Sequence, residues 1–83
     1  MVKVDLSHVS DVKQFVQTTL NCTSEILLNS GRYTVDAKSI LGIFSLDLSQ
    51  PVSLICEDEN DYPKFKEWFA PMSINNTSAG GNE

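Results

Sequence analysis

The 83-residue sequence is poor in basic side chains and contains no long apolar run. Six Lys and Arg residues stand against eleven Asp and Glu residues, which leaves a net charge of −5. The basic residues are also scattered, whereas nucleic acids and anionic membrane surfaces require clustered cations, so neither is an expected partner. The longest purely apolar runs are short, such as Ile26–Leu28, so we expect neither a transmembrane helix nor the apolar core of a signal peptide.

Cysteine and histidine are scarce as well. Cys22 and Cys56 lie far apart and neither belongs to a Cys-x-x-Cys pair, whereas a disulfide-stabilised domain of this size usually carries at least about four cysteines. We therefore expect two buried or half-buried thiols and a reducing compartment, by default the cytoplasm. His8 is the only histidine, so the ligands of a metal site are missing and no metal or cofactor is expected.

The common catalytic motifs are missing too. The sequence has no phosphate-binding Gly-x-x-x-x-Gly-Lys loop, no Gly-x-Gly-x-x-Gly turn and no Gly-x-Ser-x-Gly elbow. Cys56 is a conceivable nucleophile, but the single histidine belongs to a different segment. The acidic run Asp58, Glu59 and Asp61 is either a carboxylate pair for acid–base chemistry or, as we expect, a solvated turn before a helix. A self-contained enzyme is therefore not expected.

Apolar periodicity predicts the first two elements. Residues 2–6 alternate apolar and polar side chains, which is the pattern of a half-buried strand. From residue 11 the spacing changes to i, i+3, i+4 and i+7, one stripe of an amphipathic helix. Ser10 or Asp11 would cap this helix, and Asn21 lies near its end. The stripe consists of Val12, Phe15, Val16 and Thr19.

The remaining strands and a second, short helix are predicted from similar signals. The predicted strands are residues 25–29, 33–36 and 52–57. The first two are joined by a hairpin turn at Asn29-Ser30-Gly31, because Gly31 can adopt a positive φ. Between the last two, residues 37–44 are a candidate helix, and Ser39 is well placed to cap its start.

A last helix follows the acidic turn, with Pro63 in its first turn and Pro71 as its end. Its apolar face would consist of Tyr62, Phe65, Trp68 and Phe69. The resulting order β-α-β-β-α-β-α predicts an α+β two-layer sandwich, in which three helices cover one face of a four-stranded sheet. We expect one domain over residues 1–72 and a disordered tail over residues 73–83, which are small, polar and rich in glycine.

The segment from Val35 to Leu46, VDAKSILGIFSL, resembles the signature of HPr, the histidine-containing phosphocarrier of the sugar phosphotransferase system. The family pattern is close to A-K-S-[IL]-[ML]-G-x-[ML]-[ST]-L. The resemblance extends over about 80% of the chain and implies the HPr fold, whose four-stranded sheet is antiparallel. In HPr proteins of low-GC Gram-positive bacteria, a dedicated HPr kinase phosphorylates the serine equivalent to Ser39. Ser39 is therefore either a regulatory phosphorylation site or only a helix cap.

The second HPr motif, G-[IL]-H-x-R-P-A at the start of the first helix, is altered. Aligning Gln14-Phe15-Val16 without gaps puts His8 at the position of the phosphoacceptor histidine. In the family, this histidine takes a phosphoryl group from Enzyme I and passes it to a sugar-permease component. Ser7 replaces the residue before the histidine, Ser10 replaces the arginine, and Asp11 replaces the proline. His8 is therefore either a weakened phosphoacceptor or an exposed histidine in a degenerate loop.

These motifs lead to two functional hypotheses. The first is a degenerate HPr-like module that regulates by binding proteins, with Leu41 and Phe44 as the exposed docking pair. The second is a working phosphocarrier that relays phosphoryl groups through His8. The resemblance implies Enzyme I, permease components and HPr kinase as partners in either case. An HPr fold used for an unrelated purpose is a third hypothesis.

Overall fold

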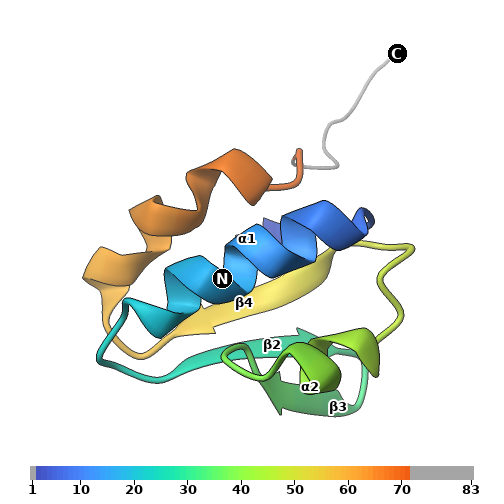
Figure 1. Cartoon of the computed structure of the whole chain (residues 1–83), viewed down its shortest axis with the longest axis horizontal. Helices are drawn as coiled ribbons and strands as arrows, with labels where there is room; N and C mark the ends of the chain where they lie inside the picture. The colour runs from blue at the N-terminus through green and yellow to red at the C-terminus, as the bar shows by residue number, and fades with distance from the viewer. Residues whose placement is uncertain (1, 72–83) are drawn as a thin grey trace.

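The polypeptide folds into a four-stranded antiparallel sheet with three helices against one face, as the sequence predicts (Figure 1). The computed structural model describes residues 2–71. The elements of these residues are β1 (Val2–Val4), α1 (Val9–Leu20), β2 (Ile26–Ser30), β3 (Tyr33–Asp36), α2 (Ile40–Phe44), β4 (Val52–Cys56) and the 3-10 helix η1 (Glu59–Trp68). The predicted disordered tail, residues 73–83, and the predicted domain end at residue 72 lie outside the described residues.

The strands of the sheet lie in the order β1-β4-β2-β3, and each neighbouring pair is antiparallel. At the β2–β3 hairpin, Gly31 has a φ of 59°, a conformation that glycine adopts without a steric penalty. Successive side chains of a strand point to opposite faces. Leu28 and Leu54 pair across β2 and β4 and point into the core, whereas Leu27 and Ile55 pair on the other face and are half-buried. This alternation decides which face the helices cover.

Helix α1 begins earlier than predicted. Its N-cap is His8, in place of the expected Ser10 or Asp11. The carbonyl of His8 accepts hydrogen bonds from the amides of Asp11 and Val12 at 3.0 and 3.2 Å, so the first helical turn closes on His8. Asp11 lies within that turn, where a negative charge interacts favourably with the helix dipole. The predicted apolar stripe is buried, and it consists of Val12, Phe15, Val16 and Thr19.

Other element ends differ from the prediction by one to three residues. The first strand stops at Val4 because the next amide, that of Asp5, donates to the carbonyl of Trp68 at 2.8 Å. Helix α2 starts at Ile40 because the amide of Ser39 donates to the carbonyl of Asp36 in a preceding turn. Strand β2 is shifted by one residue from the predicted 25–29, and β4 ends one residue before the predicted 57.

The last helix differs in type from the prediction. η1 is a 3-10 helix from Glu59, and its N-cap is Asp58, whose side chain accepts from the amide of Asn60. Pro63 lies in its interior rather than in its first turn, and it lacks the amide donor of a regular α-helix. Three residues per turn place Tyr62, Phe65 and Trp68 above one another, so this period turns all three side chains toward the molecule. Phe69, predicted as part of this face, follows η1 and is 39% exposed.

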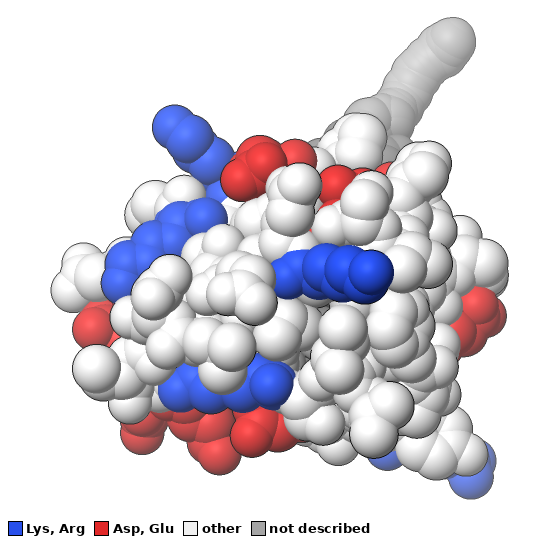
Figure 2. Space-filling model, viewed as in Figure 1, with Lys and Arg blue, Asp and Glu red and all other residues white. Residues whose placement is uncertain are grey.

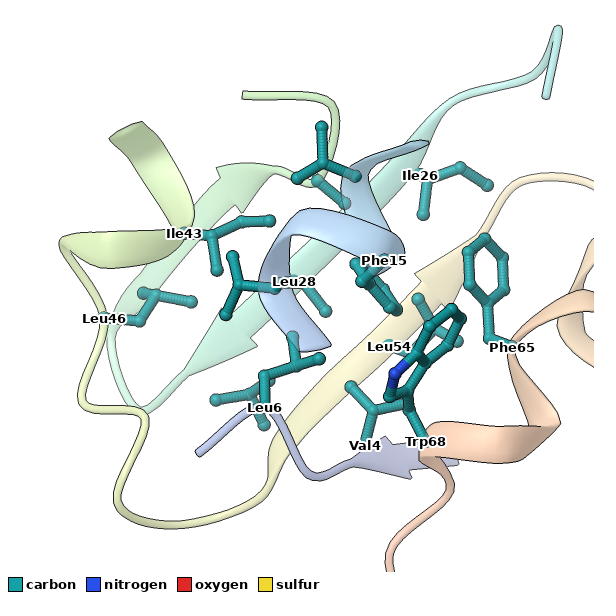
Figure 3. Packing of buried hydrophobic residues seen from close by; sticks show 14 of the residues in the cluster. Val4, Leu6, Phe15, Ile26, Leu28, Ile43, Leu46, Leu54, Phe65 and Trp68 are labelled. Carbon is teal, nitrogen blue, oxygen red and sulfur yellow. The ribbon is translucent and has the colours of Figure 1, made fainter. Parts of the chain in front are cut away.

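An aromatic cluster joins η1 to α1 at the centre of the core (Figure 3). The ring centroid of Phe15 lies 4.9 Å from that of Phe65 and 5.4 Å from that of Trp68, the latter in an edge-to-face arrangement. Aliphatic side chains of the sheet, Val4 and Leu54 among them, complete the packing (Figure 3). Because α1 packs between η1 and α2, the cluster fixes the helix layer over the sheet (Figure 1).

The residues after η1 cover the outer edge of β1. The amide of Ala70 donates to the carbonyl of Lys3 at 2.8 Å, and Phe69 forms a bridge with Val4. Strand β1 is therefore paired on both sides, by β4 and by this C-terminal segment. Pairing of this kind satisfies the backbone groups of an edge strand.

Candidate functional site

His8 lies between β1 and α1 and caps the helix with its backbone. Its side chain is 79% exposed. Nδ1 of its ring is 3.4 Å from Oγ of Ser7 and 3.6 Å from Oδ2 of Asp11, one turn along α1. The structure thus presents the imidazole to solvent at the N-terminal end of α1, where backbone amides of the first turn point outward.

The groups around His8 are acidic or neutral. Asp5 accepts a hydrogen bond from the amide of Ser7 at 3.0 Å, and this bond holds the pKa of Asp5 below its ordinary value. Asp5 is therefore ionised at neutral pH, as a second carboxylate close to the ring. The family pattern places an arginine at the position of Ser10, and Arg can bind a phosphoryl group through two parallel hydrogen bonds. A phosphoryl group on His8 would have amides of the helix N-terminus nearby, but also the like charge of Asp11.

Ser39 is the N-cap of α2, as predicted. Its Oγ accepts a hydrogen bond from the amide of Gly42 at 3.2 Å, and the residue is exposed. Since the hydroxyl oxygen is the acceptor in this bond, its proton remains available for donation. The geometry is that of a helix cap, and it leaves the hydroxyl at the surface.

Helix α2 divides its apolar side chains between core and surface. Ile43 is fully buried and Ile40 is half-buried, whereas Leu41 is 80% exposed and Phe44 is 43% exposed. The two exposed residues are three positions apart, so they lie on neighbouring turns of one helix face. A shallow groove lies between α2 and α1. Ile40 lines it on the side of α2, and the residues of α1 that line it are Lys13, Gln14, Val16 and Gln17.

The two cysteines are free and buried. Burial, and next the negative charge of Asp61, raises the pKa of Cys56 to about 11. Burial likewise raises the pKa of Cys22. Both thiols are therefore protonated at neutral pH, and since the thiolate is the nucleophilic form, Cys56 is not an activated nucleophile.

The acidic run at the start of η1 is only partly solvated, whereas a solvated turn before the helix was predicted. Asp58 and Glu59 are exposed, but Asp61 is only 5% exposed. Oδ1 of Asp61 pairs with Nζ of Lys64 at 2.7 Å, and Oδ2 accepts from the hydroxyl of Ser24 at 2.6 Å. These two bonds hold the pKa of Asp61 below its ordinary value. Asp61 is thus ionised: its Oδ1 is paired within η1, and its Oδ2 joins η1 to the loop before β2.

Charged side chains are spread over the face seen in Figure 2. In Figure 2, basic side chains on the viewed face are separated by uncharged surface, and acidic ones lie mostly toward its margins. Within residues 2–71, His, Cys, Asp and Glu side chains form no group of three or more that is able to hold a metal ion. In the same residues, every helix is too short or too polar to cross a membrane.

The chain is similar to a protein of known structure. No family model matches the chain, and no curated protein sequence does. Among solved structures, the chain is similar to the catabolite repression protein Crh of Bacillus subtilis, whose crystal structure at 1.8 Å is described as a swapped, intertwined dimer. The two are 30% identical, with a TM-score of 0.57, over 78% of this chain and 76% of that one. Their shared four-stranded sheet and three helices, together with this identity, show that the chain belongs to the HPr family.

Proposed function

We propose that this chain is a regulatory, protein-binding member of the HPr family that works in the cytoplasm with proteins of the sugar phosphotransferase system. The observation that carries this proposal is the pairing of His8 with Asp11, 3.6 Å apart, at the position where the family motif has proline. Ser10 stands where the motif has its arginine. A phosphoryl group on His8 would therefore meet a carboxylate and would lack its cation.

The binding surface in this proposal is α2. Leu41 and Phe44 expose apolar side chains on one helix face, next to the groove lined by Ile40 and α1. Large apolar side chains that are exposed together are typical of protein-binding surfaces. The likeness to Crh, a protein associated with catabolite repression, supports a role in regulation. By family resemblance, the candidate partners are Enzyme I, permease components and HPr kinase.

Ser39 is the proposed regulatory position. It lies two residues before Leu41 and is exposed, so a phosphoryl group there would change the charge of the docking surface itself. Phosphorylation adds about −1.5 to −2 charges at neutral pH and three acceptor oxygens. A partner that carries basic side chains would then gain charge-assisted hydrogen bonds.

Phosphoryl transfer through His8 is the second candidate function. One observation favours it: His8 is exposed and is the N-cap of α1, so its ring lies at the helix end whose amides stabilise anions. The contacts of its Nδ1 are long, 3.4 Å to Oγ of Ser7 and 3.6 Å to Oδ2 of Asp11, so neither holds this nitrogen tightly. The two candidates differ in the residue that receives phosphate.

Intact mass spectrometry after two separate incubations tests whether Ser39 or His8 receives the phosphoryl group. One sample receives phosphoenolpyruvate and Enzyme I, and the other receives ATP and HPr kinase. We expect one added phosphoryl group in the kinase sample, lost in Ser39→Ala, and transfer from Enzyme I at least about tenfold slower than to an ordinary HPr. Rapid, acid-labile labelling that disappears in His8→Ala would instead establish the phosphocarrier. An unlabelled Ser39 would contradict the regulatory part of the proposal.

Leu41→Asn tests the docking surface. Burying a leucine side chain at an interface contributes about 1.5–3 kcal/mol, so the variant is expected to bind HPr kinase about ten- to hundredfold more weakly in a calorimetric titration. Because Leu41 is 80% exposed, the stability of the free protein should change by no more than about 0.5 kcal/mol.

The matched control is Leu20→Asn, which makes the same change at a leucine that is 56% exposed at the end of α1. It should bind like the wild type. Equal weakening by the two variants would show that binding does not depend on α2.

A further inference from the structure

Helix α2 is too short to hold its own position. It contains five residues, and isolated helices shorter than about 12 residues are marginal in water because the first turn is costly to form. The direction in which Leu41 and Phe44 point must therefore be set by tertiary contacts: the burial of Ile43 in the core and the contacts that fix the ends of α2. The segment before α2, residues 37–39, contains several such contacts.

Ala37 is fixed from two sides. Its amide donates to the carbonyl of Ile26 in β2 at 2.9 Å. Its carbonyl lies 3.1 Å from the hydroxyl of Thr19 in α1, whose single proton it shares with the carbonyl of Val16 at 2.7 Å. Both Ala37 and Thr19 have no exposed surface. The backbone three residues before α2 is thus tied to the sheet and to the first helix.

The side chain of Lys38 connects the start of α2 to a loop that is distant in the sequence. This side chain is half-buried, and its ammonium donates to two backbone carbonyls, those of Cys22 at 2.9 Å and Ser24 at 3.1 Å. Both carbonyls belong to the loop that links α1 to β2. Hydrogen bonds from a charged donor are stronger than neutral ones, and these two connect the residue before Ser39 to a loop at least 14 positions away in the chain.

That loop is itself held by η1. The hydroxyl of Ser24 donates to Oδ2 of Asp61 at 2.6 Å, and Oδ1 of the same carboxylate pairs with Lys64 at 2.7 Å. A continuous series of contacts therefore runs from η1 through Asp61 and Ser24 to Lys38. The loop that accepts the hydrogen bonds of the Lys38 ammonium is therefore itself held in place.

We infer that Lys38 is a positioning residue for α2: its ammonium holds the start of the helix against the loop of residues 22–24 and so sets how Ser39, Leu41 and Phe44 are presented. The functional meaning of this contact rests on the proposed role of α2 in binding. The contact itself is a property of the free protein, so its test does not require a partner.

Amide hydrogen exchange in the free protein tests the inference. In Lys38→Met, which keeps most of the apolar stem and removes the charge, we expect the amides of Gly42 and Ile43 to exchange about tenfold faster or more. These two amides are suitable reporters because they donate to Oγ and to the carbonyl of Ser39. Lys38→Arg restores a charged donor and is expected to restore most of the protection.

Lys66→Met is the matched control, because it makes the same change at an exposed lysine of η1. It should leave the exchange of Gly42 and Ile43 unchanged, and amides of the central strands β2 and β4 should keep their protection in all variants. Unchanged exchange at α2 in Lys38→Met would overturn the inference. So would an equal increase at α2 and in the central strands, because that result indicates a general loss of stability.

If Leu41→Asn shows that α2 binds HPr kinase, Lys38→Met is further expected to weaken that binding several-fold, with recovery in Lys38→Arg. If α2 binds no partner, the exchange experiment still decides whether Lys38 positions the helix. The failure of one proposal is therefore distinguishable from the failure of the other.

Discussion

The double variant Ser10→Arg/Asp11→Ala is expected to accept a phosphoryl group from Enzyme I about ten- to hundredfold faster than the wild type. The substitutions supply the cation of the family motif and remove the carboxylate that lies 3.6 Å from the His8 ring. A hydrogen bond to a charged group contributes about 1.5–3 kcal/mol, which corresponds to this range of rates if it is formed in the transition state. The measurement is the rate of phosphoryl incorporation with phosphoenolpyruvate and Enzyme I, followed by intact mass.

Two controls make this gain interpretable. His8→Ala in the same background should abolish labelling, which shows that the phosphoryl group is on the histidine. Ser10→Gln/Asp11→Ala, which adds a neutral side chain, separates the effect of the new cation from the removal of the carboxylate. If the arginine variant remains as poor an acceptor as the wild type, the missing charge is not what limits transfer.

A Phe15→Ala variant is expected to lose about 3–5 kcal/mol of unfolding free energy. Phe15 is fully buried and contacts both Phe65 and Trp68, so its removal leaves a cavity between α1 and η1. At about 0.05–0.15 kcal/mol per residue, this loss is a large part of the stability of such a chain. Urea unfolding followed by the fluorescence of Trp68, the single tryptophan, measures the change.

Phe44→Ala is the control for this prediction, since it deletes the same ring from a residue that is 43% exposed. Its loss should be about 1 kcal/mol or less, because little of the surface that it contacts becomes a cavity. Similar losses at the two positions would contradict the assignment of the aromatic cluster as the centre of the core.

Local patterns in the sequence predicted much of this fold correctly. The stripe of α1, the turn at Gly31 and the cap at Ser39 each depend on residues within one or two turns of each other, and each is present in the structure. Such features are readable from sequence because the interactions that form them are between near neighbours. The family resemblance, carried by the segment around Ser39, supplied the antiparallel sheet and the candidate site residues.

Features that depend on distant partners were not predicted. The helix after the acidic turn was expected to be α-helical, yet η1 has the 3-10 period that brings Phe65 and Trp68 onto Phe15 of α1. Asp61 was expected in a solvated turn, yet it is buried because Ser24, 37 positions earlier, binds its carboxylate. In each case the deciding contact joins segments that are far apart in the chain.

At the candidate site, too, some features were predicted from the sequence and others depend on contacts between distant segments. The sequence by itself determined that His8 lacks its arginine, that Ser39 caps a helix, and that α2 has more apolar side chains than it can bury. The exposed pair that it predicts, Leu41 and Phe44, is exposed in the structure. Only the tertiary structure decided that His8 caps α1 and that Lys38 binds the loop after α1. The physical reason is that side-chain chemistry and the spacing of apolar residues depend only on residues that are close in the sequence. Burial and long-range hydrogen bonds form only after folding has brought distant segments together.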